Sequence, residues 1–552
     1  MPDGDYRRSW GLAVATVLFL GCGLAVWVAA QAPVFDIVIQ GGRVVDGTGS
    51  PWFVADVGIK GDTIVAVATH LDSAGAKTID ARTLTVGPGF VDVHSHSEPS
   101  SAGPGIIGLP LAENNIRQGV TTVFANPDGF GDVPIKPFLE RVTTAHPTIN
   151  VGSFIGHGAV RTKVVGLANR PATAAELEEM RNLVRVGMED GAFGLSTGLF
   201  YVPGSYAPLD EVVDLARLVG RYGGIHQSHT RDEAAGIVAA VRETIAIGEK
   251  GGLPTQVTHH KIIGKDNWGQ SVQTLRLIDE ARARGVDVTI DQYPYTASST
   301  SIEEGLVPQW AREGGRARLL ERLHDPELGK KVRTEVAAAL ETGRGSGNPD
   351  NVVLASCAWN PGLAGKGLGQ VLRDRRRPVT IQEATALVVE IVENGNCVGV
   401  YHAIGEQDLE RILKHPATMV ASDALPGEPE FGKDVPHPRA YGAFARVLSL
   451  YVREKGVITL EEAVRKMSSF PAQRMGLRDR GLVRPGMKAD IAVFDPARVR
   501  DAATFERPHQ YAEGFGYVIV NGEIVFQNGA MTSARPGRVL YGPGVINATA
   551  AR

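Results

Sequence analysis

Short apolar runs recur along most of this chain, and helical patterns of apolar and polar positions lie between them. This alternation predicts β/α units whose parallel strands form one buried sheet or barrel. Eight runs qualify as strands, which is the number that closes a barrel when a helix follows each strand. The expected strands are residues 91–93, 120–125, 150–155, 192–196, 224–227, 255–258, 287–291 and 418–421.

The two ends of the chain have a different pattern, in which apolar and polar residues alternate and Gly-rich turns intervene. This pattern is typical of antiparallel strands, and Asn521-Gly522 is a hairpin signal between two of them. We expect residues 34–85 and 481–552 to build one small β-sandwich from both chain ends. The predicted fold class is therefore α/β, with a (β/α)8 TIM-like barrel at residues 86–480.

Within the barrel region, residues from about 301 to 380 contain helical runs but few strand signals. The helical runs cover residues 316–323 and 326–340. We expect this segment to be an insertion that covers the mouth of the barrel.

The amino terminus has the pattern of an export signal. Arg7-Arg8 precedes an uncharged stretch, residues 9–35, that contains the apolar run 10–30. We expect residues 1–30 to be a signal peptide or membrane anchor and the protein to be periplasmic or envelope-associated. Cleavage after Ala30, a lipoprotein site at Cys22, a twin-arginine route and an uncleaved anchor all stay open, since about 20 apolar residues span a bilayer.

Composition narrows the class of partner. The chain is 43% hydrophobic and 21% charged, which is typical of a globular protein with ample core. A net charge of -4 gives no electrostatic footprint for nucleic acid, so a small-molecule substrate is expected, and contact with a membrane only through the N-terminal segment. Three cysteines, Cys22, Cys357 and Cys397, are too few and too scattered for a disulfide framework or a cysteine-based zinc site.

Two histidines follow the first expected barrel strand. His94 and His96 are two positions apart, and in a strand that spacing puts both imidazoles on one face. Neutral imidazoles bind zinc or a similar divalent ion, and barrel enzymes carry their chemistry at the carboxyl ends of strands. A pair of surface histidines near a turn is the alternative interpretation.

Later strands end in further residues that can bind a metal. They are Asp128, His229, His259 and Asp423. With His94 and His96 they form a ring of imidazoles and carboxylates suited to one or two divalent ions, Zn²⁺ first among them. Asp128 has a second interpretation as the cap of a loop, and Asp423 as a helix N-cap or a plain ligand.

Longer motifs give the chain a family resemblance. The strand Gly-Phe-Val-Asp-Val-His-Ser-His, which ends at His96, resembles the amidohydrolase superfamily. Residues 191–206, 229–233, 258–261, 291–295 and 437–439 are similar to those of the D-aminoacylases, or N-acyl-D-amino-acid deacylases. The likeness runs from about Val34 to the terminus. It implies a barrel with a β-sandwich and metal-dependent hydrolysis of the amide bond of N-acyl-D-amino acids.

Roles for individual residues follow from chemistry and from the resemblance. Asp423 is placed to take a proton from the attacking water and pass it to the departing nitrogen. The resemblance implies that Lys261, Tyr293 and Arg439 hold the substrate carboxylate, for which cations and a phenol are suited, and Ser298 is a further hydroxyl. Each of these four has the alternative of a salt bridge or contact at the barrel rim.

Two other histidines need separate interpretations. His157 either lines the pocket, where it would stabilise an oxyanion, or is a structural histidine. His260, next to a predicted ligand, should point to the opposite face of its strand and pack there.

One position departs from the family pattern. D-aminoacylases have a metal-binding cysteine where this chain has Asp128, in Ala125-Asn-Pro-Asp128-Gly129. A carboxylate still bridges two cations, but it is a harder ligand than a thiolate and should shift metal preference and occupancy.

Two other functions compete with deacylation. Hydantoinase-like and dihydroorotase-like amidohydrolases act on cyclic amides or related C–N bonds and place a carboxylated lysine on a barrel strand. No lysine stands at the end of the fourth expected strand, where the sequence is Gly194-Leu-Ser-Thr. A binding protein that lost catalysis is disfavoured by the intact set of metal-binding side chains.

Overall fold

Parallel strands from two sheets join end to end into a ring. The computed structural model describes residues 35–100, 103–427 and 434–545. Its parallel strands fall in two sheets, β6-β7-β8 and β9-β10-β11-β12-β13-β18. Only Phe154 separates β8 from β9, and a parallel bridge between Ser95 and Ala424 joins the ends of β6 and β18. The strands are β6 (Phe90–Asp92), β7 (Val120–Ala125), β8 (Asn150–Ser153), β9 (Ile155–Gly156), β10 (Gly194–Gly198), β11 (Ile225–His229), β12 (Thr255–Val257), β13 (Val288–Gln292) and β18 (Thr418–Val420). All eight predicted barrel strands are confirmed.

Two backbone hydrogen bonds close the ring beyond these strands. The N–H of Asp423 donates to the carbonyl of His94 (2.9 Å), and the N–H of His96 donates to the carbonyl of Ala424 (3.0 Å). The first and last barrel strands are therefore joined at residues that the sequence predicts to be metal ligands.

Helices connect the strands and cover the ring. Thr459 caps α16, because its hydroxyl accepts the N–H of Glu462 at the start of this helix. Outside the insertion, the helices are α1 (Gly105–Gly108), α2 (Glu113–Ile116), α3 (Lys136–Ala145), α4 (His157–Val164), α5 (Ala174–Asp190), α6 (Leu209–Arg221), α7 (Ile237–Gly251), α8 (Ser271–Ala283), α14 (Glu406–Lys414), α15 (Arg439–Arg446), α16 (Leu460–Met467) and α17 (Ser469–Arg474).

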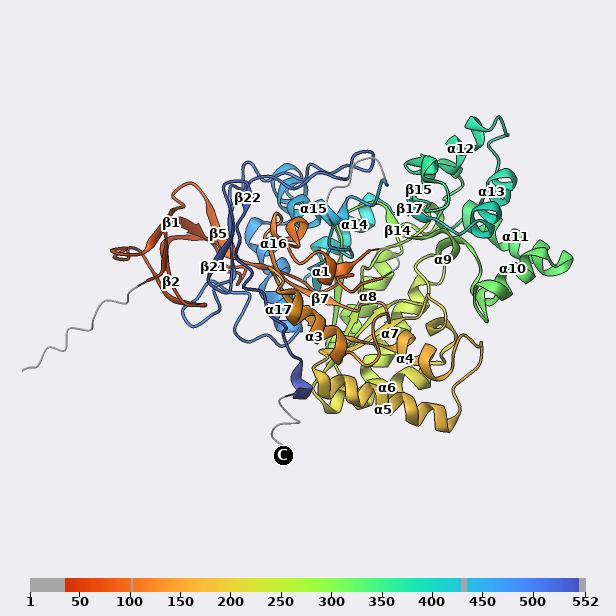
Figure 1. The fold of residues 1–552 in the computed structure, drawn as a ribbon, viewed down its shortest axis with the longest axis horizontal. Helices are drawn as coiled ribbons and strands as arrows, with labels where there is room; N and C mark the ends of the chain where they lie inside the picture. The colour runs from red at the N-terminus through yellow and green to blue at the C-terminus, as the bar shows by residue number, and fades with distance from the viewer. Residues whose placement is uncertain (1–34, 101–102, 428–433, 546–552) are drawn as a thin grey trace, which may run out of the picture.

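Strands from both chain ends form a separate β domain at one end of the molecule (Figure 1). Its nine strands make one sheet, in which antiparallel pairing of β5 with β19 joins the two ends of the chain. Asn521 and Gly522 have positive φ (47° and 82°) and form the predicted hairpin turn. The strands are β1 (Ile37–Val44), β2 (Phe53–Lys60), β3 (Thr63–Ala68), β4 (Lys77–Asp80), β5 (Thr85–Pro88), β19 (Ile491–Phe494), β20 (Phe515–Val520), β21 (Glu523–Gln527) and β22 (Ala530–Met531).

The insertion is a subdomain at the opposite end of the molecule (Figure 1). It has its own apolar core and a sheet of order β14-β17-β15-β16. It extends beyond the predicted 301–380, because β17 pairs with both β14 and β15. The polar sequence Ser298-Ser-Thr-Ser of β14 contains no apolar signal that reveals a strand. The elements are β14 (Ser298–Ser301), β15 (Val352–Ser356), β16 (Lys366–Gly367), β17 (Val398–Tyr401), α9 (Ile302–Leu306), α10 (Arg316–His324), α11 (Pro326–Glu341), α12 (Leu368–Asp374) and α13 (Ile381–Glu393).

A disulfide bond crosses this subdomain. Cys357 and Cys397 are bonded (S–S 1.99 Å) and are 40 residues apart in sequence. The sequence does not reveal this bond, because the spacing of the two cysteines says nothing about the β15–β17 pairing that brings them together. The third cysteine and the predicted segment 1–30 lie outside the described residues.

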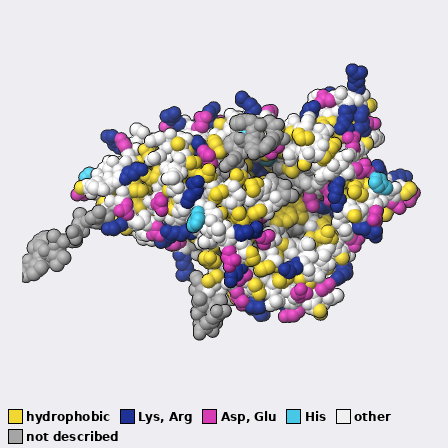
Figure 2. Space-filling model, viewed as in Figure 1, with side chains coloured by type: hydrophobic (Ala, Val, Ile, Leu, Met, Phe, Trp, Pro, Cys, Tyr) yellow, Lys and Arg dark blue, Asp and Glu magenta, His cyan; other side chains and the backbone are white. Residues whose placement is uncertain are grey.

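Two further features concern the charge on the surface and the hydropathy of the helices. On the face in Figure 2, basic and acidic side chains are interspersed. No helix in the described ranges is both long and apolar enough to cross a bilayer.

Candidate metal centre and active site

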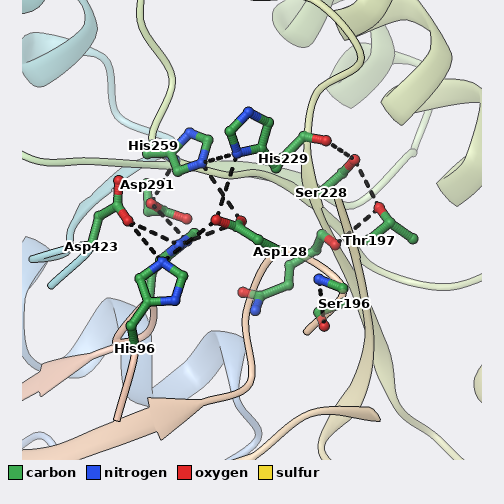
Figure 3. Close-up of polar contacts among 12 residues, drawn as sticks. His96, Asp128, Ser196, Thr197, Ser228, His229, His259, Asp291 and Asp423 are labelled. Carbon is green, nitrogen blue, oxygen red and sulfur yellow. Dashed lines mark hydrogen bonds and ion pairs between the residues drawn. The ribbon is translucent and has the colours of Figure 1, made fainter. Parts of the chain in front are cut away.

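The six predicted metal ligands come together at the carboxyl ends of the barrel strands. Their ligand atoms form two groups, and within each group all of the atoms lie within 4.8 Å of one another. Asp128 belongs to both groups, and in Figure 3 it lies between His96 on one side and His229 with His259 on the other. The first group is His94, His96, Asp128 and Asp423, and the second is Asp128, His229 and His259.

Distances within the first group match those between ligands of a shared ion. The Nε2 atom of His94 lies 3.5 Å from oxygens of both Asp128 and Asp423, and that of His96 lies 3.6 and 3.2 Å from oxygens of the same carboxylates. Two ligands bound at about 2.0–2.1 Å to one tetrahedral zinc ion are about 3.3–3.4 Å apart. The group therefore has the spacing that a single cation requires.

The second group has the same spacing to its carboxylate. The Nδ1 of His229 and the Nε2 of His259 each lie 3.6 Å from an oxygen of Asp128. These two ring nitrogens are 2.7 Å apart. The two carboxylate oxygens of Asp128 thus face both histidine pairs, as a bridging ligand would.

The outward nitrogen of every one of these histidines faces a carboxylate. Nδ1 of His96 lies 3.2 Å from Glu98, and Nδ1 of His94 lies 3.8 Å from Asp291. Glu233 serves the second pair, with its Oε1 at 3.7 Å from His229 and 3.3 Å from His259. Carboxylates behind histidine ligands orient the rings and raise their basicity, which is the usual outer arrangement of a metal site.

Buried polar atoms in the cluster lack hydrogen-bond partners among the described residues. They include both ring nitrogens of His94, Oδ1 of Asp128 and Nε2 of His229. Unsatisfied buried polar groups are costly, and a cation bound among them would satisfy several at once. The residues present therefore fit a divalent metal.

Three of the candidate ligands have a strained backbone. Asp128, His259 and Asp423 have φ of 56°, 33° and 53°, a left-handed conformation that non-glycine residues rarely adopt. Such conformations persist where surrounding structure enforces them, and they concentrate at functional sites.

Electrostatics in the cluster favour a positive charge at its centre. Burial alone would lower the pKa of His94, but the carboxylates of Asp128, Asp423 and Asp291 raise it to about 9. Burial would likewise raise the pKa of Asp128, but the imidazoles of His94 and His259 hold it well below its usual range. Without a metal ion, the carboxylates favour a proton on a nearby imidazole. A bound metal ion would supply that positive charge instead.

The candidate cap roles of the two aspartates find no support. Oδ1 of Asp128 has no hydrogen-bond partner among the described residues, and the N-cap of α15, the next described helix after Asp423, is Pro438.

Three predicted substrate-binding residues lie beside the cluster. Arg439 and Lys261 approach the ring of Tyr293, at 4.9 and 5.4 Å from its centroid. The hydroxyl of Tyr293 is buried without a partner among the described residues. Arg439 donates to Asp423 (2.6 Å), whereas Lys261 pairs with Glu233 and lies 2.8 Å from Nδ1 of His259.

A cavity of about 540 Å³ opens beside Arg439, but neither Lys261 nor Tyr293 lines it. Asp423 and Arg439 lie on one side of it, and much of the remaining described lining is apolar. A larger cleft of about 1270 Å³ lies between α7 and the inserted subdomain, but none of the six candidate ligands lines it. The smaller cavity is therefore the better candidate for substrate.

Two important residues were not predicted from sequence. Glu233 contacts both histidines of the second group and Lys261. It lies in segment 229–233, which carries part of the family resemblance, but no role was predicted for it. Arg344 comes from the inserted subdomain and donates to Glu233 (2.8 Å) and to Ser298 (2.9 Å). Ser298 is thus bound by the protein itself, and nothing in the sequence around Arg344 indicates its position.

His157 and His260 belong to the scaffold. His157 lies 3.1 Å from Glu211, which also pairs with Arg161, and these three side chains are buried. This cluster favours the structural interpretation of His157. Nε2 of His260 lies 2.8 Å from the hydroxyl of Thr274 on α8, so it packs outward as predicted.

Comparison with known proteins places this arrangement among hydrolases. Residues 374–526 match the model of the Amidohydrolase family. A D-aminoacylase from Alcaligenes xylosoxydans xylosoxydans is 34% identical over 529 residues, which span 92% of this chain and 97% of the relative. An N-acyl-D-glutamate deacylase from the same organism is 35% identical over 527 residues, spanning 92% and 96%.

Solved structures give the same result. A crystal structure of D-aminoacylase is 33% identical, with a TM-score of 0.78, and the match covers 92% of this chain and all of that one. N-acyl-D-glutamate deacylase from Bordetella bronchiseptica, solved with zinc and a phosphonate inhibitor, is 32% identical with a TM-score of 0.77, and the coverage is again 92% and 100%.

Proposed function

The chain belongs to the D-aminoacylase family of amidohydrolases, and from that premise we propose that it hydrolyses the amide bond of N-acyl-D-amino acids, releasing a carboxylate and a D-amino acid. The observation that carries the proposal is the pair of candidate ligand groups that share Asp128. They lie beside a cluster of cationic and phenolic side chains that suits a substrate carboxylate.

The residues fit one or two divalent ions, and we propose zinc. His94, His96, Asp128 and Asp423 would hold one ion and Asp128, His229 and His259 a second. A bound ion would polarise the amide carbonyl and lower the pKa of water towards about 7.

Proton transfer is assigned to Asp423. Its carboxylate faces the candidate metal site and the cavity at once, so a water attacking the amide lies within its reach. Asp423 takes the proton of that water and returns it to the amide nitrogen, because an amine anion is a poor leaving group.

Substrate orientation is assigned to three neighbours. Arg439, Lys261 and Tyr293 bind the carboxylate of the amino acid, which fixes the scissile amide relative to Asp423. A planar guanidinium, and a phenol whose hydroxyl has no hydrogen-bond partner among the described residues, suit a carboxylate in a buried pocket.

We also propose that the enzyme works outside the cytoplasm. The Cys357–Cys397 bond supports this, because disulfides persist mainly in oxidising compartments. The proposed signal within residues 1–30 lies outside the described residues.

The test of function is a paired assay. N-acetyl-D-leucine, N-acetyl-D-glutamate and N-acetyl-D-aspartate are compared with their L enantiomers and with a hydantoin, and metal content is measured on the same preparation. Hydrolysis of a D compound with at least one ion per chain supports the proposal. Activity only on the hydantoin, or activity in protein shown to be metal-free, would falsify it.

A further inference from the structure

One wall of the candidate substrate cavity comes from the inserted subdomain. Ala355 and Ser356 of β15 and Val398 of β17 line the same cavity as Asp423 and Arg439. Ser356 and Val398 are also paired opposite one another in the sheet. The ends of these two strands therefore form a wall beside the residues proposed to bind and cleave the substrate.

The two bonded cysteines are the direct chain neighbours of the paired residues Ser356 and Val398. Cys357 follows Ser356 and Cys397 precedes Val398, and both sulfur-bearing side chains are buried. The β15–β17 register shifts between Leu354 and Ser356, so the ladder is irregular where it reaches the cavity. A covalent link at this place fixes a strand spacing that the hydrogen bonds alone define less well.

Polar contacts lead from this wall to Arg439. The N–H of Val435 donates to the carbonyl of Ala355 (2.8 Å). Two residues later, Nε2 of His437 lies 2.9 Å from the carbonyl of Ala297, which packs in the apolar cluster that contains Ala355. Nδ1 of His437 accepts the N–H of Arg439 (3.1 Å). The wall and the start of α15 are thus one connected unit.

We propose that the Cys357–Cys397 disulfide is a positioning device for substrate binding. It holds the β15–β17 wall in place and, through Ala355 and Val435, the segment that presents Arg439 to the substrate carboxylate. The inference rests on the proposed function, since it takes the bound group to be the carboxylate of an N-acyl-amino acid. It adds that substrate affinity depends on an oxidised subdomain.

A plain stabilising bond makes different predictions. A disulfide that closes a long loop stabilises a fold mainly by restricting the unfolded chain, whatever its sulfurs touch in the native state. In that case its loss lowers the melting temperature and leaves KM unchanged. If the disulfide positions the substrate-binding wall, its loss raises KM.

The experiment uses the full chain with both bonded cysteines changed, Cys357→Ala with Cys397→Ala. We expect KM for the preferred N-acyl-D-amino acid to rise about tenfold, since small displacements of orienting groups weaken binding steeply. The metal content should stay close to that of wild type, whereas kcat should fall as KM rises, because Arg439 also contacts Asp423. Val336→Ala, in the buried core of the same subdomain but outside the cavity lining, controls for loss of stability.

A second variant keeps the disulfide and breaks the connection. Val435→Pro removes the N–H that Ala355 accepts, and we expect a similar rise in KM with the disulfide intact. This variant decides the matter if the double alanine variant does not fold. An unchanged KM in either folded variant overturns the proposal, as does an equal rise in Val336→Ala at a matched melting temperature.

Hydrogen exchange separates this proposal from the proposed function. The hydrogen-bonded backbone amides of Val435 and Arg439 should exchange faster in the double variant than in wild type, whether or not the assayed compound is the true substrate. Unchanged exchange overturns the positioning role. Absence of deacylase activity in wild type rejects only the function.

Discussion

The guanidinium of Arg439 donates a hydrogen bond of 2.6 Å to Oδ2 of Asp423, while Oδ1 of the same carboxylate lies 3.2 Å from Nε2 of His96. One carboxylate thus contacts a candidate metal ligand with one oxygen and a candidate substrate-binding cation with the other. Substrate binding and proton transfer are therefore coupled through a single side chain.

Asp423→Asn should nearly abolish turnover in a folded protein. The amide keeps the size of the side chain and one oxygen but cannot accept the proton, and positioned acid-base groups contribute about 10² to 10⁴ in rate. Asp434→Asn is the matched control, since Asp434 lines the same cavity and pairs with His509 instead. Steady-state kinetics together with a melting curve check the prediction, and a kcat within tenfold of wild type contradicts it.

Arg439→Ala should raise KM and lower kcat together. The variant loses a cation proposed to bind the substrate carboxylate, and the lost contact with Asp423 also frees the proposed base to move. Wild type should prefer an N-acyl-D-amino acid to its amide-capped analogue, and the variant should lose that preference. Equal preference in both proteins would assign Arg439 to the scaffold.

Asp128→Ala should reduce the number of bound metal ions, because this carboxylate belongs to both ligand groups. Asp128→Cys introduces the ligand that the family resemblance implies at this position, and it should keep at least one ion tightly bound. If Asp128 only capped a loop, its loss would lower stability by about 0.5–2 kcal/mol and leave the metal in place. Elemental analysis after dialysis distinguishes these outcomes, and wild-type stoichiometry in Asp128→Ala dismisses the ligand role.

Glu233→Gln should weaken the ion held by His229 and His259. The amide is uncharged and a poorer acceptor for the outward ring nitrogens, and loss of such a partner typically costs about 10- to 100-fold in metal affinity. Glu243→Gln is the control, because that carboxylate pairs with Arg231 away from the cluster. Competition with a chelator measures both affinities, and equal values argue against the orienting role.

His226 should make the fold sensitive to acid. It lies between the hydroxyls of Thr197 and Thr255, and burial lowers its pKa to about 3. Between pH 6.5 and 3 the unfolded chain binds a proton that the folded one excludes. The free energy of unfolding then falls as pH falls, by up to about 1.4 kcal/mol per pH unit for this one group.

The measurement is urea unfolding of metal-free protein at several pH values. His226→Gln should be less stable than wild type at pH 7.5 but show a shallower fall towards pH 5. His70→Gln, at a side chain that is 85% exposed, should keep the wild-type slope. A wild-type slope in His226→Gln would mean that other groups carry the acid sensitivity.

Much of the barrel and of the candidate metal centre could be predicted from the sequence, because both depend on the local order of apolar and polar residues along the chain. Each strand is a short apolar run, and a polar residue just after such a run has to lie at the carboxyl edge of the barrel, as His229 and Asp423 do. Asp128 was predictable by its position after the second strand although the residue type differs from that of relatives.

Contacts that depend on distant segments were not predictable. Arg344 reaches Glu233 because the inserted subdomain packs over the barrel, and that packing leaves no pattern around residue 344. The Cys357–Cys397 bond depends on the pairing of β15 with β17, and β14 is too polar to read as a strand. The role of His157 was undecided because its partner Glu211 is 54 residues away.

The two hydrogen bonds that close the barrel also set the order in which the metal centre is assembled. His96 and Asp423 are 327 residues apart, so the four-residue group is incomplete until β18 has been synthesised and has docked against β6. That group therefore cannot offer all four ligands to an ion before the ring closes, and an ion bound there would stabilise the closed ring. On an export route that carries the chain unfolded, the enzyme would load its ion after translocation, from the supply in the destination compartment.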